Sequence, residues 1–399
     1  MVLRIHYNFD LKGGAEFDIL KILDVFEKYG GESWKNYLLL LTKETKGFKS
    51  KLYGTDKIIF YKTEKELKGY LNELILKLKV KIIHIHSQPY KNLTKLILDL
   101  GLPTFRSMHE AMIICPGWSK YWLKDDKPCQ ISFSKKCLIN AYTKMCTRSR
   151  NPKNLFEAYQ NVKYETEIAV KKYERVFVYS DYMKNEAIST NIPAGKIVKV
   201  PSPQYDHFKD IHKNIDEKVS IVYSGRLSKQ KGIKYLVEAA HMLKQNDYVN
   251  FEVLIFGDGP DKDSLVAQTT QLDLNDKIVF YGWVERKQLI EHYKTSHISV
   301  IPSTYPDNFP NTVAESMLAK MVVIAFDSGG TCEWFDDGLS GFKTKTKNAI
   351  GIFTELQKLM KSKNKILKIG EAARNKILST HSLGSTFDTY NKYYNKVLK

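Results

Sequence analysis

The chain has 399 residues, which is more than one ordinary hydrophobic core accommodates and favours two domains of about 150–200 residues each. Apolar residues make up 43% and charged residues 27%, which excludes a disordered chain, and no apolar run approaches the roughly 20 residues of a membrane-spanning helix. The net charge of +18 favours an anionic partner, although a general enrichment in lysine explains it equally well. Because the basic residues are spread over many segments without an arginine-rich arm, we expect no nucleic-acid partner.

Strand-like and helix-like segments alternate through the first half of the chain. The segment 2–9 is strand-like and leads directly into a helix pattern over 15–29, so we expect a cytoplasmic protein without a signal peptide. Further strands are predicted at 37–42, 80–87 and 175–180, and helix-like sequence follows the last two.

The same alternation resumes after about residue 200. Strands are predicted at 219–226, 250–259, 279–284, 298–304 and 321–327, most of them next to helix-like sequence. This rhythm predicts an α/β fold with two doubly wound, Rossmann-like domains, joined by the proline-containing segment 199–210. Ligands of such sheets bind beyond the strand ends, so we expect the active site in a cleft between the domains.

Glycines and cations follow two of the predicted strands. Gly13 and Gly14 stand where the first strand turns into a helix, which either lets a ligand approach the backbone or is an ordinary turn. Arg226 follows the strand at 219–226, and Lys231 stands at the start of the next helix. Two cations and a helix N-terminus suit a phosphate or diphosphate, and two solvated surface cations are the alternative.

Three later loops suit a nucleotide or a sugar. The turns at 256–260 and 279–284 could hold a planar base through backbone groups, or could be plain turns. Asn311 and Thr312 lie in the first turn of a helix that starts near Pro310, where their amides could meet phosphate. Glu315 could accept both hydroxyls of a ribose, or it could only complement the helix dipole.

The cysteines and one histidine pair are possible metal ligands. Four of the five cysteines cluster in one region, namely Cys115, Cys129, Cys137 and Cys146. A disulfide framework is not expected in a cytoplasmic chain, which leaves a structural zinc site or scattered buried thiols. His84 and His86 share one face of a strand, and we favour buried, hydrogen-bonded histidines over a metal pair.

Taken together and in order, these segments resemble the retaining glycosyltransferases of family 4, of the bacterial exopolysaccharide and capsule type. The resemblance rests on the Gly13–Gly14 loop, HIHS (84–87), MHE (108–110), VYSDYMK (178–184), VPSPQYD (200–206), YSGRLSKQKG (223–232), IFGDGP (255–260), VFYGWV (279–284) and DNFPNTVAESMLA (307–319). It implies a GT-B fold with an acceptor-binding domain at 1–200, which carries a cysteine-containing insert at about 110–150. A nucleotide-sugar-binding domain at 201–380 follows, and a C-terminal helix at 381–399 crosses back to the first domain.

The resemblance also implies roles for individual residues. Arg226 and Lys231 match the pair that binds the donor diphosphate, and Glu315 matches the glutamate that holds the ribose. His109 and Asp307 fall where the family contacts the donor sugar, although Asp307 is one methylene shorter than the usual glutamate. The implied catalytic set is His109, Asp307, Arg226 and Lys231, and the further donor-binding positions are Gly13, Gly14, Gly225, Gly257, Asp258, Gly282, Trp283, Val284, Asn308, Phe309, Pro310, Asn311, Thr312 and Glu315.

The implied activity moves a sugar from a nucleotide diphosphate sugar, preferably a UDP-sugar, to a hydroxyl of a glycan or lipid-linked acceptor, with retention and without a required cofactor. A GDP-sugar-dependent mannosyl- or fucosyl-type transferase and a nucleotide-sugar epimerase are the alternatives. Basic and aromatic segments at 118–127 and 135–150 favour peripheral contact with an anionic membrane, at the inner face of the plasma membrane, or form a solvated cationic surface.

Overall fold

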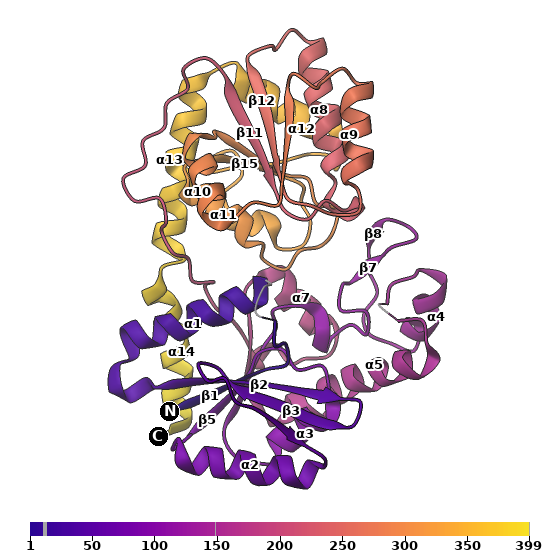
Figure 1. Ribbon diagram of the computed structural model, residues 1–399, viewed down its shortest axis with the longest axis vertical. Coiled ribbons are helices and arrows are strands. Elements are labelled where there is room, and N and C mark those ends of the chain that lie inside the picture. The colour runs from indigo at the N-terminus through magenta and orange to yellow at the C-terminus, as the bar shows by residue number, and fades with distance from the viewer. Residues whose placement is uncertain (11–13, 148, 399) are drawn as a thin grey trace. The chain divides into compact units, whose positions relative to one another are not determined.

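A computed structural model describes residues 1–10, 14–147 and 149–398 of the chain (Figure 1). The chain divides into two compact units, one formed by Met1–Pro203 with Leu383–Lys399 and the other by Gln204–Ser382. Each unit has its own main sheet and its own hydrophobic core. None of the helices in the described ranges combines the length and the apolar character that crossing a bilayer requires.

The first unit is built on an eight-stranded sheet with the order β10-β9-β6-β5-β1-β2-β3-β4. Neighbouring strands are parallel except for β2–β3 and β3–β4. The central strand β1 is buried along its whole length, including the polar side chains of Arg4 and His6. The elements are β1 (Val2–His6), α1 (Gly14–Gly30), β2 (Asn36–Glu44), β3 (Gly47–Leu52), β4 (Ile58–Tyr61), α2 (Glu64–Lys77), β5 (Ile82–Ile85), α3 (Lys91–Leu98), β6 (Thr104–Ser107), β7 (Tyr121–Trp122), β8 (Lys127–Pro128), α4 (Lys136–Thr143), α5 (Pro152–Tyr164), α6 (Val170–Lys172), β9 (Tyr173–Val178), α7 (Asp181–Ser189), β10 (Ile197–Lys199) and α14 (Leu383–Leu398).

The antiparallel strands β3 and β4 depart from the expected, wholly parallel arrangement. A two-residue turn joins Glu44 to Gly47, whose φ of +102° only glycine adopts without strain. A side chain at Gly47 would also place its Cβ 2.1 Å from the carbonyl oxygen of Tyr61. Sequence periodicity did not indicate this hairpin because β3 and β4 are short and partly exposed.

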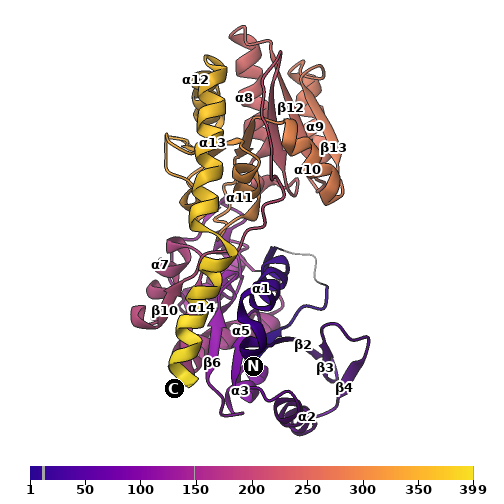
Figure 2. The same ribbon diagram turned by 90° about the vertical axis from the view of Figure 1, so that its left-hand side faces the viewer.

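The C-terminal helix α14 packs within the first unit, alongside α1 (Figure 2). Aromatic rings make this contact, since the ring of Phe26 in α1 lies 5.3 Å from that of Phe387 and 5.8 Å from that of Tyr394. Tyr390 and Tyr394 are completely buried. The last helix of the chain therefore completes the core of the first unit.

The second unit contains a six-stranded, wholly parallel sheet with the order β13-β12-β11-β14-β15-β16. Its first strand lies at the centre and the order reverses beside it, which is the Rossmann arrangement. The predicted α/β fold with two Rossmann-like domains is therefore confirmed. The elements are β11 (Val219–Ser224), α8 (Ile233–Gln245), β12 (Phe251–Phe256), α9 (Lys262–Gln271), β13 (Ile278–Gly282), α10 (Arg286–Thr295), β14 (Ile298–Ile301), α11 (Asn311–Leu318), β15 (Val322–Ala325), β16 (Phe342–Lys343), α12 (Ala349–Met360) and α13 (Lys363–Thr380).

The segment that precedes β11 is fixed to the second unit by an ion pair. The guanidinium of Arg374 in α13 contacts both carboxylate oxygens of Asp206, at 3.0 and 2.5 Å. Arg374 also donates to the carbonyl oxygen of Leu318 at 2.6 Å. Phe208 and Ile211 are buried in the same core. These contacts connect the segment to both α11 and α13.

We expect Asp206→Ala to destabilise the second unit, because it leaves the mostly buried guanidinium of Arg374 without its counter-ion. The free energy of unfolding should fall by about 3 kcal/mol, measured by urea denaturation. As a control, Glu291→Ala removes the partner of Lys294 from an exposed pair in α10 and should cost less than about 0.5 kcal/mol. Equal losses in the two variants would contradict this role of Asp206.

Candidate functional site

The second unit has its topological switch point between β11 and β14, where the strand order reverses. In a parallel sheet of this kind, ligands bind beyond the carboxyl ends of the strands at that point. The loop at 225–228 leaves β11 there, and the loop at 302–310 leaves β14 beside it. Both loops contain residues that the sequence analysis singled out, so the switch point is the candidate site of this unit.

The loop after β11 presents a free cation. Gly225 has a φ of +149° and is exposed, and Arg226 is exposed as well, with no ion pair or hydrogen bond from its guanidinium within the described ranges. The hydroxyl of Tyr223 donates to the carbonyl oxygen of Arg226 at 3.0 Å. Burial, together with the charge of Asp307, raises the pKa of Tyr223, so this hydroxyl keeps its proton. The backbone at Arg226 is therefore held while its side chain remains available to an anion.

The second predicted cation is already paired. Lys231 Nζ lies 2.8 and 2.7 Å from the two carboxylate oxygens of Asp307. The two side chains are 28% and 18% exposed, so a ligand can still reach the pair. The structure thus brings together two residues that the sequence analysis assigned to different parts of the donor. An anion that binds Lys231 must share it with Asp307 or displace that carboxylate.

Two glycines after β15 support the loop that carries Asp307. The amide of Gly330 donates to the carbonyl oxygen of Asp307 at 2.8 Å. A Cβ at Gly329, where φ is +60°, would lie 2.2 Å from the same oxygen. Ser328 Oγ donates to the carbonyl oxygen of Thr304 at 3.0 Å. Asp307 is therefore positioned by backbone contacts that no larger residue at Gly329 allows.

The loops after β11, β12 and β13 pack on one another. The amide of Gly257 donates to the carbonyl oxygen of Gly282 at 2.7 Å, and a Cβ at Gly257 would lie 1.9 Å from the carbonyl oxygen of Gly225. Asp258 accepts from the amide of Gly259 at 2.7 Å, which is the main reason that its pKa is lowered. These predicted donor-binding positions therefore lie in one layer of backbone at the carboxyl edge of the sheet.

The residues after β13 differ in exposure. Trp283 is 75% exposed, whereas Val284 packs against the hydrophobic core of the second unit. An exposed indole at the edge of this layer is available to stack on a planar group. Val284 can contribute its backbone to a ligand, while its side chain is engaged in packing.

Helix α11 begins at Asn311, so Pro310 precedes the helix and is not its first residue. Gln204 donates to Asn311 Oδ1 at 2.8 Å. The ring of Phe309 stacks on Trp334 with centroids 3.8 Å apart, which fixes the approach to the helix. Asn308 and Thr312 are half-buried around this start, and the side chain of Phe309 serves packing.

Glu315 has a partner that sequence reasoning missed. Arg286, the first residue of α10, donates from Nη2 to Glu315 Oε1 at 2.8 Å. Tyr293, also in α10, is buried beside them, and burial followed by the charge of Glu315 raises its pKa. The local sequence around Arg286 contains a capping box formed by Glu285 and Gln288, which indicates the start of a helix. It does not indicate a contact with a carboxylate 29 positions away.

In the first unit, His109 follows β6 and is half-buried. Its Nε2 lies 2.9 Å from Nδ1 of His86. Burial, followed by the nearby His6, lowers the pKa of His109 to about 3, so this imidazole is neutral at physiological pH. The prediction that His84 and His86 are buried and hydrogen-bonded is confirmed.

The start of α1 also carries a paired carboxylate. Gly14 is the first residue of α1, and a Cβ there would meet nothing within 4 Å; Gly13 lies outside the described residues. Glu16 accepts from Asn8 at 2.9 Å and lies 3.2 Å from His6 Nε2. Burial opposes ionisation of Glu16, but these hydrogen bonds and its own backbone amide outweigh it and lower its pKa to about 2.

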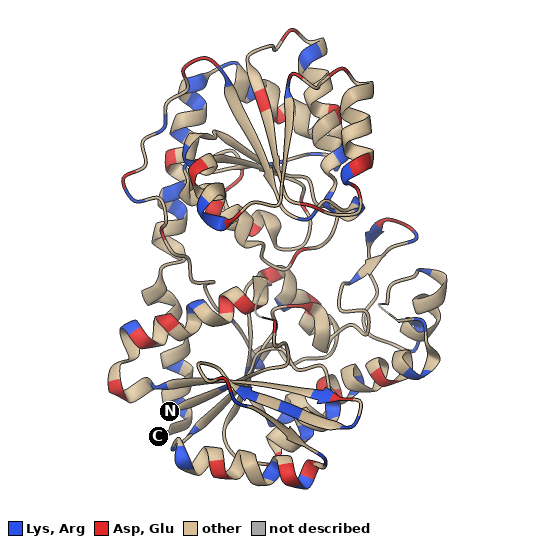
Figure 3. Cartoon of the chain, viewed as in Figure 1, with Lys and Arg blue, Asp and Glu red and all other residues tan. Residues whose placement is uncertain are grey.

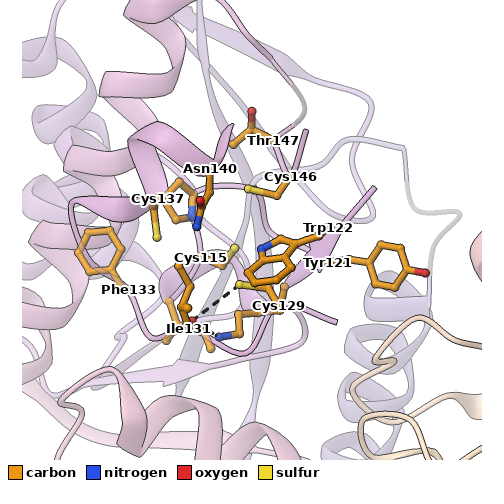
Figure 4. Close-up of a pocket in the computed structure, with 14 residues that line it drawn as sticks. Cys115, Tyr121, Trp122, Cys129, Ile131, Phe133, Cys137, Asn140, Cys146 and Thr147 are labelled. Carbon is orange, nitrogen blue, oxygen red and sulfur yellow. Dashed lines mark hydrogen bonds between the residues drawn. The ribbon is translucent and has the colours of Figure 1, made fainter. Parts of the chain in front are cut away.

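The four clustered cysteines line one small cavity of about 20 Å³ in the first unit (Figure 4). All are free thiols, and burial, followed by the three neighbouring thiols, raises the pKa of Cys146 to about 12. No group of three or more His, Cys, Asp or Glu in the described part of the chain is arranged to hold a metal ion. The prediction of structural zinc at Cys115, Cys129, Cys137 and Cys146 is therefore not supported. The alternative of scattered thiols does not hold either, because all four cysteines line the same cavity.

Comparison with known proteins gives matches to both sequence and fold. Residues 204–376 match the family model of group 1 glycosyl transferases. An uncharacterized glycosyltransferase of Methanocaldococcus jannaschii is 35% identical over 133 residues, which are 33% of each protein. The N,N'-diacetylbacillosaminyl-diphospho-undecaprenol alpha-1,3-N-acetylgalactosaminyltransferase of Campylobacter jejuni is 28% identical over 186 residues, 47% of each protein. The chain thus spans about a third to a half of the length of the curated relatives it matches.

Among solved structures, the chain resembles the Anabaena protein HepE in complex with UDP and glucose. The TM-score is 0.66 over 99% of both chains, at 14% sequence identity. This likeness identifies the fold as GT-B, within which residues 204–376 match the group 1 glycosyltransferases.

Proposed function

We propose that this protein is a retaining glycosyltransferase that moves a sugar from a UDP-sugar to a hydroxyl of a glycan or lipid-linked acceptor. The observation that carries the proposal is the set of polar groups at the switch point of the second unit. There, Arg226 has no partner among the described residues, Lys231 and Asp307 form an accessible pair, and Glu315 is held in α11 by Arg286. The family match of residues 204–376, and the UDP and glucose held by the similar Anabaena protein, support this choice.

Each part of the donor has a partner in this proposal. The diphosphate binds Arg226 and takes a share of Lys231 from Asp307, because phosphate is a strong acceptor of charge-assisted hydrogen bonds. Glu315 accepts the ribose hydroxyls through the oxygens that Arg286 leaves open. The base lies on the backbone layer formed by the residues around 257 and 282, and the sugar lies against the loop at 307–312.

The transfer itself uses no protein nucleophile. The bond from C1 of the sugar to the diphosphate breaks, and its electron pair stays on the leaving phosphate oxygen. That oxygen takes the proton of the acceptor hydroxyl, whose own oxygen bonds to C1 from the same face. Arg226 and Lys231 stabilise the growing negative charge, each by about 2–4 kcal/mol. In this proposal His109 acts on the donor sugar as a neutral imidazole.

We expect UDP-sugars to raise the melting temperature of the protein in a thermal-shift panel that also contains GDP- and ADP-sugars. A ligand that binds only the native state stabilises it by mass action, so the shift should grow with donor concentration. Stabilisation by GDP-sugars alone would favour the mannosyl- or fucosyl-type alternative. A flat panel would contradict the proposed function.

Arg226→Gln should lower turnover about a hundredfold while leaving the unfolding free energy unchanged, because the guanidinium stabilises the leaving diphosphate and makes no contact that the fold needs. Turnover is measured as release of the nucleoside diphosphate from the donor that stabilises the protein in the panel. Lys361→Gln, which removes an exposed charge at the end of α12, is the matched control and should keep full activity. Wild-type turnover in Arg226→Gln would remove this residue from the mechanism.

We also propose that the insert at 110–150 contacts an anionic membrane surface. Leu123, Ile139 and Tyr142 are 50%, 64% and 46% exposed. Apolar side chains among cations suit the boundary between lipid headgroups and acyl chains. The Campylobacter relative is named for a diphospho-undecaprenol acceptor, which supports a lipid-linked acceptor here. The exposed lysines of this region are Lys124, Lys127, Lys135 and Lys136. Figure 3 marks lysine and arginine along the ribbon in blue.

The protein should therefore sediment with liposomes that contain anionic lipid, and progressively less so as salt screens the lysines. The double variant Leu123→Ser, Ile139→Ser should bind several-fold more weakly. Leu76→Ser changes a side chain of α2 that is 77% exposed, and it should bind like the wild type. Absence of sedimentation at low salt would contradict membrane contact.

A further inference from the structure

A buried cation stands in the central strand of the first unit. Arg4 is fully buried, and its guanidinium makes no ion pair with a carboxylate of the described residues. Its Nε donates to Asn36 at 2.8 Å, and the rings of Phe26 and Tyr390 flank it at 4.9 and 5.6 Å. A buried charge without a counter-ion is costly, so the remaining contacts of Arg4 require an explanation.

Those remaining contacts are to two histidines that the strand register brings to the same face. Arg4 of β1 is paired with His84 of β5, and His86, two positions further on, points to the same side. Arg4 Nη1 lies 3.1 Å from His84 Nδ1 and 3.0 Å from His86 Nε2. His86 Nδ1 in turn lies 2.9 Å from Nε2 of His109. One guanidinium is thus bonded to two imidazoles directly and, through His86, to a third. The hydroxyl of Tyr394 lies 2.5 Å from the same nitrogen of His84.

The positions of the protons follow from the chemistry of Arg4, because a guanidinium only donates hydrogen bonds. His84 Nδ1 and His86 Nε2 must therefore be acceptors. Burial keeps the pKa of both rings well below the ordinary value, followed by Arg4 for His84 and by His84 and Arg4 for His86, so each ring carries a single proton. His84 holds that proton on Nε2 and donates it to Ser107 Oγ at 2.8 Å. His86 holds it on Nδ1 and donates to His109.

His109 accepts this bond at Nε2, and its own lowered pKa keeps it neutral. Its single proton is then on Nδ1. We infer that Arg4 is a positioning residue, which sets the tautomers of three histidines and leaves the single proton of His109 on Nδ1, an atom buried in the first unit. An effect on turnover rests on the proposed function, whereas the tautomers follow from this network alone.

Nitrogen-edited NMR of histidine-labelled, ligand-free protein tests the tautomers directly. At neutral pH we expect the Nδ1–H pattern for His109 and His86 and the Nε2–H pattern for His84. The signals are assigned by their loss in His109→Gln, His86→Gln and His84→Gln. An Nε2–H or doubly protonated ring at His109 would overturn the inference, whatever the activity of the protein.

Arg4→Met tests whether Arg4 is the cause. An apolar side chain of similar length can replace a buried charge without loss of stability, so this variant should fold. His109 should then show a mixture of tautomers, and kcat should fall about tenfold, the equivalent of one hydrogen bond, with the KM for the donor nearly unchanged. Arg175→Met, a change in β9 of the same unit, is the control and should leave the His109 signals as they are.

The outcomes separate this inference from the proposed function. A single Nδ1–H tautomer that persists in Arg4→Met would overturn the role of Arg4. A tautomer mixture with unchanged kcat would overturn the link to catalysis. Failure of every sugar nucleotide to bind the wild type would contradict the proposed function, while the tautomers of the ligand-free protein stand or fall on their own spectra.

Discussion

The carboxyl ends of all strands in a parallel sheet lie at one edge, and this constraint decides where the second unit can carry chemistry. The strands β11 and β14 are neighbours, but β11 is followed by β12 on one side of the sheet and β14 by β15 on the other. The loops that leave these two strands therefore start beside each other. Close packing follows from it, because a Cβ at Gly232 would lie 2.0 Å from the carbonyl oxygen of Pro302. The two loops that carry Arg226, Lys231 and Asp307 are therefore a single packed structure.

Ion pairing distinguishes three cationic side chains at this edge of the sheet that the sequence alone does not separate. Lys231 is neutralised by Asp307 and Arg286 by Glu315, whereas Arg226 has no partner among the described residues. In the proposed function, an incoming diphosphate meets one unpaired cation first and must compete for the second. Displacement of Asp307 from Lys231 would free a carboxylate for the sugar at the moment that the phosphate binds. Although the side chain of Asp307 is short, both of its carboxylate oxygens reach Lys231, so the two residues can exchange partners without a shift of the backbone.

Much of the fold was predictable because its signals are local. Apolar runs located β1, β2, β5, β9 and β11–β15, and glycines located the turns at 257 and 282. Some strand ends were placed up to three residues too late, since aromatic residues continue past the last ladder bond, as at Tyr7 and Phe9 after β1. The site was less predictable. Arg286 meets Glu315 and Arg4 meets His84 only through tertiary structure, across 29 and 80 positions. The irregular spacing of the cysteines likewise gave no indication that they gather around one cavity.

Two of the three arginines that are buried among the described residues, Arg374 and Arg4, show how a charge with a counter-ion differs from one without it. Arg374 of α13 forms an ion pair with Asp206 and donates to the carbonyl oxygen of Leu318 in α11, so it connects three segments of the second unit. Its contribution to stability explains its position. Arg4 is more deeply buried but donates to neutral groups, and burial of a cation against neutral imidazoles gains less than it costs. Arg4 instead fixes where the protons lie. Because a guanidinium only donates hydrogen bonds, each neutral ring bonded to it, directly or through another ring, is restricted to one tautomer. A buried charge that orients other side chains at a cost in stability is expected near a functional site, and the hydrogen-bonded chain from Arg4 through His86 ends at His109.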